Sequence, residues 1–150
     1  MNYAIVQTAQ TQLMAQTRGE RNHNPLNIRR SDGTRWLGQC PKQHDREFVQ
    51  FQSDLFGFRA AFRILRTYFR LQNIDTLRGI IYRWAPPEDG NNTESYIATV
   101  SRWTNIAPNK HLTFEDKEAL VAIVAAMAQV ESHVMIVDTD ILRKAYELAK

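Results

Sequence analysis

The segment from Arg18 to Arg29 reads R-G-E-R-N-H-N-P-L-N-I-R and holds the densest set of residues able to do chemistry. It places the carboxylate of Glu20 beside the amides of Asn22, Asn24 and Asn27, just after a stretch with helical periodicity. An acid at the junction of a helix and a loop is a common way to hold a general acid over a cleft, and asparagines can orient sugar amides and hydroxyls. The alternative interpretation is that Glu20 is a solvated helix-end residue and the asparagines only form turns.

Cleavage of a glycosidic bond is a chemistry that such an acid can support. A Glu or Asp protonates the leaving oxygen when a partly apolar site raises its pKa. Hydrolysis usually adds a second carboxylate, as nucleophile or as base for water. A lytic transglycosylase manages with one acid, because the substrate's own hydroxyl attacks. The other acids to consider are Asp32, Glu88, Glu94 and Glu131.

Glu131 is the main competitor of Glu20. It follows Met127 by four residues and Val124 by seven, so it continues the apolar stripe of a helix that we expect to be buried. A carboxylate in that position must be paired, raised in pKa or at the edge of a cleft. We favour a buried salt bridge with one of the many arginines as its explanation.

Aromatic side chains offer further contacts to a sugar. Tyr96 lies one helical turn before Val100, and its hydroxyl could meet the sugar or the acid; ordinary core packing with a polar tip is the alternative. Tryptophans can stack on sugar rings, although most tryptophans in a protein of this size belong to the core. The three tryptophans are Trp36, Trp84 and Trp103.

The charged residues indicate which kinds of molecule the protein could bind. The net charge of +3 is a mild bias toward anionic partners, which include nucleic acid, membranes and bacterial cell wall. Four arginines follow one predicted helix at helical spacing, and this arginine stripe suits an anionic polymer or, more often, a solvated face. The stripe consists of Arg59, Arg63, Arg66 and Arg70. The four histidines show no metal-ligand spacing and no phosphate-binding glycine loop is present, so we expect neither metal nor cofactor.

The length of 150 residues predicts one domain that buries about 70% of its unfolded surface. Cys40 is the only cysteine, so no internal disulfide forms. Residues 1–16 lack the basic start, apolar run and cleavage site of a signal peptide. The longest apolar run, residues 119–128, is too short to span a bilayer.

Periodicity predicts a mostly helical chain. Helices are expected over residues 2–17, with Gly19 as the stop, and over 54–72, 76–84, 93–106, from 113 through the apolar run, and 139–148. Residues 27–37 are expected to form a hairpin with an Asp32-Gly33 turn, and residues 48–51 alternate like a third short strand. The plan is α+β and predominantly helical, with a small hairpin inserted after the first helix.

Residues 19–29 resemble the G-x-R-N-N-N-P-x-N-I-R signature of phage virion and prophage proteins grouped with the lysozyme-like superfamily. The similarity runs over about residues 18–131 and includes the W-A-P-P-E motif that starts at Trp84. A weaker resemblance is to soluble lytic transglycosylases. Glu20 and Asn24-Pro25 have the spacing of their E-S-x-F-N-P segment, with Arg21 in place of the serine.

These resemblances imply a single lysozyme-like domain over residues 1–150 that degrades peptidoglycan. The reaction implied is that of a muramidase or lytic transglycosylase, which cleaves the glycan strand between N-acetylmuramic acid and N-acetylglucosamine. Glu20 would be the general acid, and Tyr96, matched to the later E-T-x-x-Y-V segment, an active-site hydroxyl. The substrate-binding residues implied are Asn22, Asn24, Asn27, Trp36, Gln50, Glu88 and Thr93.

The expected partner is therefore bacterial peptidoglycan, with other virion proteins as further partners and no membrane span. Such a protein is made in the bacterial cytoplasm and acts in the periplasm or cell wall, or travels in a phage particle. One alternative is a virion structural or wall-binding protein that keeps the fold without the chemistry. A nucleic-acid binder that uses the arginine stripe is the least favoured, because the net charge is modest and no recognition motif is evident.

Overall fold

The computed structural model describes residues 16–134 and 137–150. The helix predicted over residues 2–17 lies outside these residues except for its last two positions, which are not helical. A single helical turn, α2 (Arg18–Arg21), follows directly. Gly19 was expected to stop a helix, but it lies inside this turn and is buried against the side chain of Ser132.

The prediction of a mostly helical chain is confirmed. After α2 come α3 (Asp54–Leu71), α4 (Leu77–Trp84), a 3₁₀ turn η1 (Pro87–Asp89), α5 (Thr93–Thr104), α6 (Lys117–Ser132) and α7 (Thr139–Ala149). Thr76, Asn92 and Asp138 each stand just before a helix and accept an amide hydrogen of its first turn. These caps explain why the starts of α4, α5 and α7 were predicted to within one residue.

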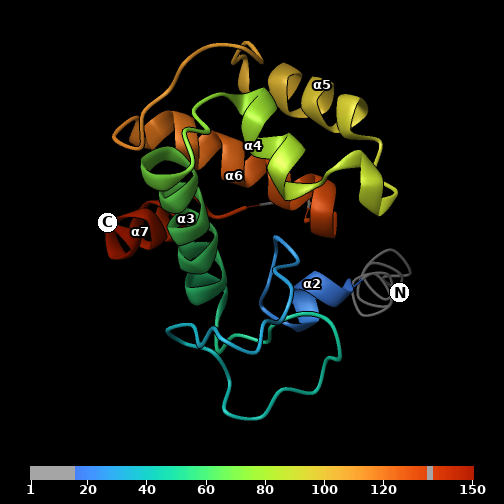
Figure 1. The fold of residues 1–150 in the computed structure, drawn as a ribbon. Helices are drawn as coiled ribbons and strands as arrows, with labels where there is room; N and C mark the ends of the chain where they lie inside the picture. The colour runs from blue at the N-terminus through green and yellow to red at the C-terminus, as the bar shows by residue number, and fades with distance from the viewer. Residues whose placement is uncertain (1–15, 135–136) are drawn as a thin grey trace, which may run out of the picture.

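The predicted start of α6 at Thr113 is wrong, because the helix begins at Lys117. The carboxylate of Asp116 accepts the amide hydrogen of Thr113 at 2.8 Å and closes a turn ahead of the helix. The prediction that α6 is buried is confirmed: it packs against α2, α3, α5 and α7 (Figure 1). Its buried side chains run from Leu120 to Ser132.

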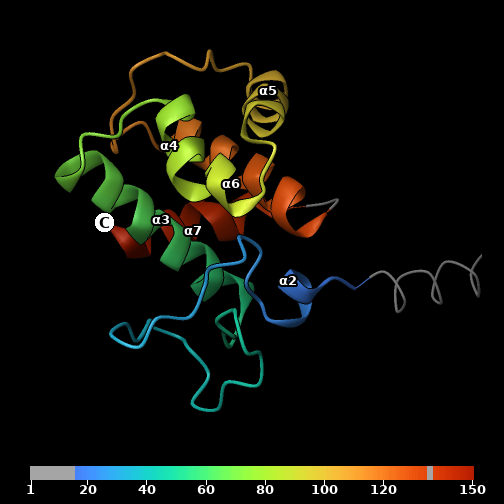
Figure 2. The same cartoon turned by 45° about the vertical axis from the view of Figure 1, so that its right-hand side comes forward.

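The chain between α2 and α3 has little regular secondary structure; we call residues 22–53 the amide loop. In Figures 1 and 2 it lies at one end of the helical body, away from α5. The predicted turn at residues 31–34 forms, with the amide of Thr34 donating to the carbonyl of Ser31. The predicted hairpin does not form, because the bridges join Arg29 to Phe48 and Gln39 to Phe51.

Burial explains this different pairing. Ile28, Val49 and Phe51 are buried, whereas Thr34 and Arg35 are exposed. Pairing of residues 28–29 with 48–49 hides two apolar side chains, which a pairing with residues 34–35 would not do.

Two arginines of the arginine stripe on α3 make hydrogen bonds to another helix. Arg59 donates to the carbonyl of Leu148 and Arg63 to that of Ala149, at the last turn of α7. The carbonyls at a helix C-terminus lack intrahelical partners and carry partial negative charge, so cations stabilise them. Within the part of the chain that the structure describes, no helix is long and apolar enough to cross a membrane.

Candidate active site

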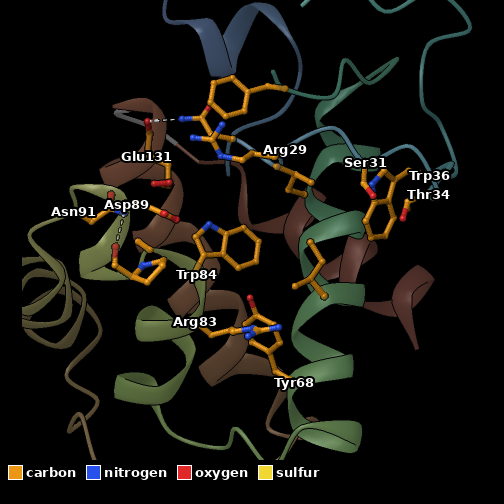
Figure 3. A pocket seen from close by; sticks show the side chains of 16 residues that line it. Arg29, Ser31, Thr34, Trp36, Tyr68, Arg83, Trp84, Asp89, Asn91 and Glu131 are labelled. Carbon is orange, nitrogen blue, oxygen red and sulfur yellow. Dashed lines mark hydrogen bonds between the residues drawn. The ribbon is translucent and has the colours of Figure 1, made fainter. Parts of the chain in front are cut away.

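A cleft of about 430 Å³ lies where the amide loop faces the helical body (Figure 3). The loop contributes one wall through residues 27–36 and Phe48. The opposite wall comes from α3, the end of α4, the η1 region and the end of α6. The residues that line this opposite wall are Ile64, Tyr68, Arg83, Trp84, Ala85, Pro86, Asp89, Asn91 and Glu131.

Glu131 lies in the last turn of α6, and its side chain reaches this cleft (Figure 3). Burial raises the pKa of Glu131 to about 7, against a weaker opposing effect of the positive charge of Arg29. The partial negative charge of the helix C-terminus also disfavours a carboxylate at this position. A carboxyl group with such a pKa is partly protonated near neutral pH, and its protonated form is able to donate the proton.

The buried salt bridge that we favoured for Glu131 is not formed. Within residues 16–134 and 137–150, no arginine or lysine nitrogen lies within 4.0 Å of its carboxylate. The nearby guanidinium of Arg29 instead pairs with Glu47 at 3.2 Å and lies over the ring of Phe48. Of the three outcomes open to a carboxylate on an apolar stripe, two apply to Glu131: its pKa is raised, and it lies at the edge of a cleft.

A second carboxylate shares this part of the cleft. Asp89 ends η1, and in Figure 3 it and Glu131 point into the same corner of the cavity. Asn91 lies next to them and donates to the carbonyl of Pro86 at 3.1 Å. The indole of Trp84 projects between this acidic corner and the rest of the cleft, where it offers a flat apolar surface.

Two buried oxygens near Glu131 have no hydrogen-bond partner among the described residues: Oδ1 of Asn27 and the hydroxyl of Tyr96. Asn27 has a left-handed backbone (φ 51°), and its Nδ2 donates to the carbonyl of Glu131 at 2.9 Å. Burial raises the pKa of Tyr96 far above its usual range, and the charge of Glu131 adds to this effect. Because buried oxygens are normally paired, these two atoms stand out.

Asn22 and Asn24, in contrast, are used inside the amide loop. The amide nitrogen of Asn24 donates to the carbonyls of Ile28 and Val49, and its oxygen accepts the amide hydrogen of Ile28, all at 2.9 Å. Asn22 donates to Asp45 and accepts from Gln50. Both asparagines are buried and away from the cleft lining.

Of the remaining predicted substrate-binding residues, one lines the cleft and three lie outside it. Trp36 lines the cleft, but Gln50 lines a different depression beside Cys40. Thr93 is buried and donates to the carbonyl of Ala85 at 2.7 Å, which fixes the start of α5. Glu88 is exposed, and its neighbour Asp89 occupies the cleft instead.

Glu20 lines a separate cavity of about 300 Å³, together with His23, Asp54 and Asp138. The structure therefore does not bring Glu20 to the cleft that contains Glu131. Other acids are also elsewhere. Glu94 pairs with Arg78 and accepts from the hydroxyl of Tyr82, and Asp32 is exposed within the amide loop, where it lines another depression.

Sequence reasoning did not single out Arg29, Tyr68, Arg83, Asp89 or Asn91 as site residues. Arg29 ends the N-I-R signature, but nothing marked it as a site residue. No local signal distinguishes the other four, which come together only when α3, α4 and the loop after α4 pack around the cleft. Trp84 and Glu131 did carry a signal, since one begins the W-A-P-P-E motif and the other interrupts an apolar stripe. No group of three or more His, Cys, Asp or Glu suited to a metal ion occurs in the described ranges.

The fold defines a predominantly helical protein, and a comparison with known proteins shows the family to which it belongs. The chain belongs to the family of Protein P5 of Pseudoalteromonas phage PM2, to which it is 37% identical over 139 residues. The match spans 91% of this chain and 84% of Protein P5. No protein-family model matches the chain.

Proposed function

We propose that this phage protein cleaves the glycan strand of peptidoglycan, with Glu131 as the proton donor. The observation that supports the proposal is the carboxyl group of Glu131, raised in pKa to about 7 by burial at the edge of a cleft. A glycosidase needs a protonated acid at neutral pH, and a partly apolar site is the usual means of providing one. The tryptophans and polar side chains around it suit a sugar chain.

The proposed step begins with transfer of the Glu131 proton to the glycosidic oxygen. The bond between the anomeric carbon and that oxygen breaks, the leaving sugar departs as an alcohol, and positive charge develops on the sugar ring. The charge is quenched either by water or by the hydroxyl at C6 of the muramic acid. Asp89, in the same corner as Glu131, would take the proton of attacking water. When the C6 hydroxyl attacks instead, the Glu131 carboxylate left by the first step would take the proton of that hydroxyl, while Asp89 stabilises the cation.

Incubation of purified protein with peptidoglycan, with soluble products analysed by mass spectrometry, tests the proposal. We expect Glu131→Gln to lose about a thousandfold in rate, since general acids contribute two to four orders of magnitude. Glu20→Gln is the matched control, and we expect it to keep most of the activity because Glu20 lies in another cavity. Reducing ends would identify a hydrolase, and anhydro-sugars a lytic transglycosylase.

The opposite result would assign the acid to Glu20, as the transglycosylase resemblance implies. Equal rates for the wild type and both variants would exclude both acids. Circular dichroism and thermal melting of each variant separate loss of chemistry from loss of fold.

A second candidate function is that of a virion structural or wall-binding protein carried in the phage particle. It draws support from the relative, which is a phage protein whose name states no activity. This function predicts that the protein sediments with purified cell walls and releases no soluble fragment from them. The same product analysis distinguishes the two functions.

A further inference from the structure

The cleft has two chemically different ends. Glu131 and Asp89 form the acidic corner, whereas Arg83 and Tyr68 lie at the other end, with Trp84 between them (Figure 3). Arg83 comes from the last turn of α4 and Tyr68 from α3, so two separate helices bring these groups together. One end therefore concentrates negative charge and proton donation, and the other presents positive charge and a hydroxyl.

Arg83 is the cation of the cleft that remains available for a ligand. Within the described residues its guanidinium makes no ion pair or hydrogen bond, and its side chain is exposed. The other guanidinium in the lining, that of Arg29, is occupied by Glu47 and by the ring of Phe48. A guanidinium offers several N–H donors in a planar fork that fits a carboxylate.

Tyr68 adds a second donor at the same end. Burial raises the pKa of Tyr68 to about 12, so the phenol keeps its proton at neutral pH, while the nearby positive charge of Arg83 acts in the opposite direction. Its ring is fixed against Trp84 in an edge-on arrangement, with centroids 6.4 Å apart. Packing therefore fixes the position of the Tyr68 ring, and its hydroxyl group lies at the same end of the cleft as Arg83.

We propose that Arg83, with the hydroxyl of Tyr68, binds a carboxylate of the substrate while Trp84 packs on the intervening sugar. The inference rests on the proposed function and specifies its substrate class as a glycan that carries carboxylates. Peptidoglycan has two such sources, the lactyl group of muramic acid without a peptide and the acidic residues of the stem peptide. A neutral polymer of N-acetylglucosamine has neither, so Arg83 would discriminate against it.

Binding measured by calorimetry on the inactive Glu131→Gln protein tests this inference without depending on turnover. The probes are the disaccharide of N-acetylglucosamine and N-acetylmuramic acid with a free lactyl carboxylate, the same disaccharide bearing a stem peptide, and neutral chitobiose. We expect Arg83→Gln to weaken binding of at least one acidic probe by about tenfold, the loss of one charge-assisted hydrogen bond. Chitobiose binding should stay unchanged.

Three further variants sharpen the test. Arg83→Lys should recover part of the affinity, because it keeps the charge but not the fork. Tyr68→Phe should cause a smaller loss that is again confined to the acidic probe. Arg102→Gln is the matched control: Arg102 is exposed on α5 and lines none of the cavities described above. Its affinities should equal those of the parent protein.

The source of the carboxylate follows from which acidic probe responds to Arg83→Gln. Equal losses for chitobiose and the acidic probes, or no loss for any probe, would overturn the inference. Failure of the proposed function looks different. In that case the wild type releases no products from peptidoglycan, while the selective loss of acidic-probe binding in Arg83→Gln persists.

Discussion

The amide loop and the cleft are both rich in polar side chains. They differ in how many hydrogen-bonding groups of those side chains have a partner within the protein. In the loop, the side-chain amide of Asn24 donates two hydrogen bonds and accepts one, all with backbone groups. In the cleft, Oδ1 of Asn27 is buried without a partner among the described residues, and Glu131 has no ion-pair partner there. The hydroxyl of Tyr96, which lies outside the cleft lining, is likewise unpaired among the described residues. A saturated polar network stabilises a fold, whereas an unsaturated one leaves groups available for a substrate.

The carboxylates of the two regions illustrate the same difference. The guanidinium of Arg18 beside Asp45 holds the pKa of that carboxyl well below its usual range, with help from Asn22 and backbone amides. Asp45 therefore stabilises the fold above its unfolded pKa, and this contribution is lost as the pH falls through its folded pKa. Glu131 has its pKa raised, so the sign of its contribution is reversed.

The largest effect on stability is expected from removing an amide of the saturated network. Asn24→Ala leaves the buried amide of Ile28 and the carbonyls of Ile28 and Val49 without that partner. At 1–3 kcal/mol for each unsatisfied group, partly relieved by relaxation, we expect a loss of about 4 kcal/mol in the free energy of unfolding. Urea denaturation measures it.

Asn109→Ala is the control for this prediction. Asn109 is exposed and accepts one bond from Arg78, so its loss should be within about 0.5 kcal/mol. Equal effects of the two substitutions would show that the buried network does not hold the loop.

A somewhat smaller effect of opposite sign is expected at Glu131. The pKa of Glu131 is about 7 in the folded state against 4.5 for an ordinary glutamate carboxyl in water, a difference worth roughly 3 kcal/mol. The wild type should lose this stability as the pH rises from 4.5 through 7, because the unfolded state gives up its proton first. Glu131→Gln should therefore be more stable than the wild type by about 2–3 kcal/mol at pH 8, and similar to it at pH 4.

Unfolding free energies of both proteins at the two pH values test this prediction. Glu88→Gln serves as the control, because Glu88 is exposed and makes no hydrogen bond or ion pair within the described ranges. A Glu131→Gln protein that is less stable than the wild type at pH 8 would contradict a desolvated carboxylate in the cleft.

The smallest of these effects concerns the contact between α2, which leads into the amide loop, and the end of α6, beside the cleft. A Cβ on Gly19 would lie 1.9 Å from Oγ of Ser132 and 2.8 Å from its Cβ, next to Glu131. We expect Gly19→Ala to cost about 2 kcal/mol through this overlap. Gly33→Ala, where no atom lies within 4 Å of the added Cβ, should be neutral.

A double-mutant cycle then measures the coupling. Ser132→Gly removes the overlapping side chain, so the double variant should be less destabilised than the sum of the two single variants. If the destabilisations of the two single variants simply add, the methyl group at residue 19 and the side chain of Ser132 have no steric contact.

The sequence predicted the helical part of the molecule well and the amide loop poorly, for a physical reason. The boundaries of α3, α4, α5 and α7 follow from periodicity, prolines and local caps, all of which are short-range signals. In the loop, the backbone of residues 48–51 is paired with side chains and with segments distant in sequence. A turn motif such as Asp32-Gly33 cannot specify such partners, although the turn itself formed.

The candidate site also depends on contacts between segments that are distant in the sequence. The spacing of Glu20 from Asn24-Pro25 identified a segment that is important to the fold, but which acid faces the cleft depends on where α6 ends. Glu131 was visible as a charge on an apolar stripe, and that anomaly did not depend on a match to any motif. Arg83 and Tyr68 could not be found this way, because exposed arginines and half-apolar tyrosines are ordinary on helices.

The hydrogen bonding of residues 48–51 also has a consequence for self-association. All four of their amide hydrogens are donated: to Asp45, to the carbonyl of Ile28, to the side chain of Gln43 and to the carbonyl of Asn22. Exposed extended segments with unpaired amides invite strands of other copies to add to them, and proteins block such edges in several ways. Here glutamine and aspartate side chains occupy the edge, so this extended segment offers a second copy no free row of donors on which to aggregate.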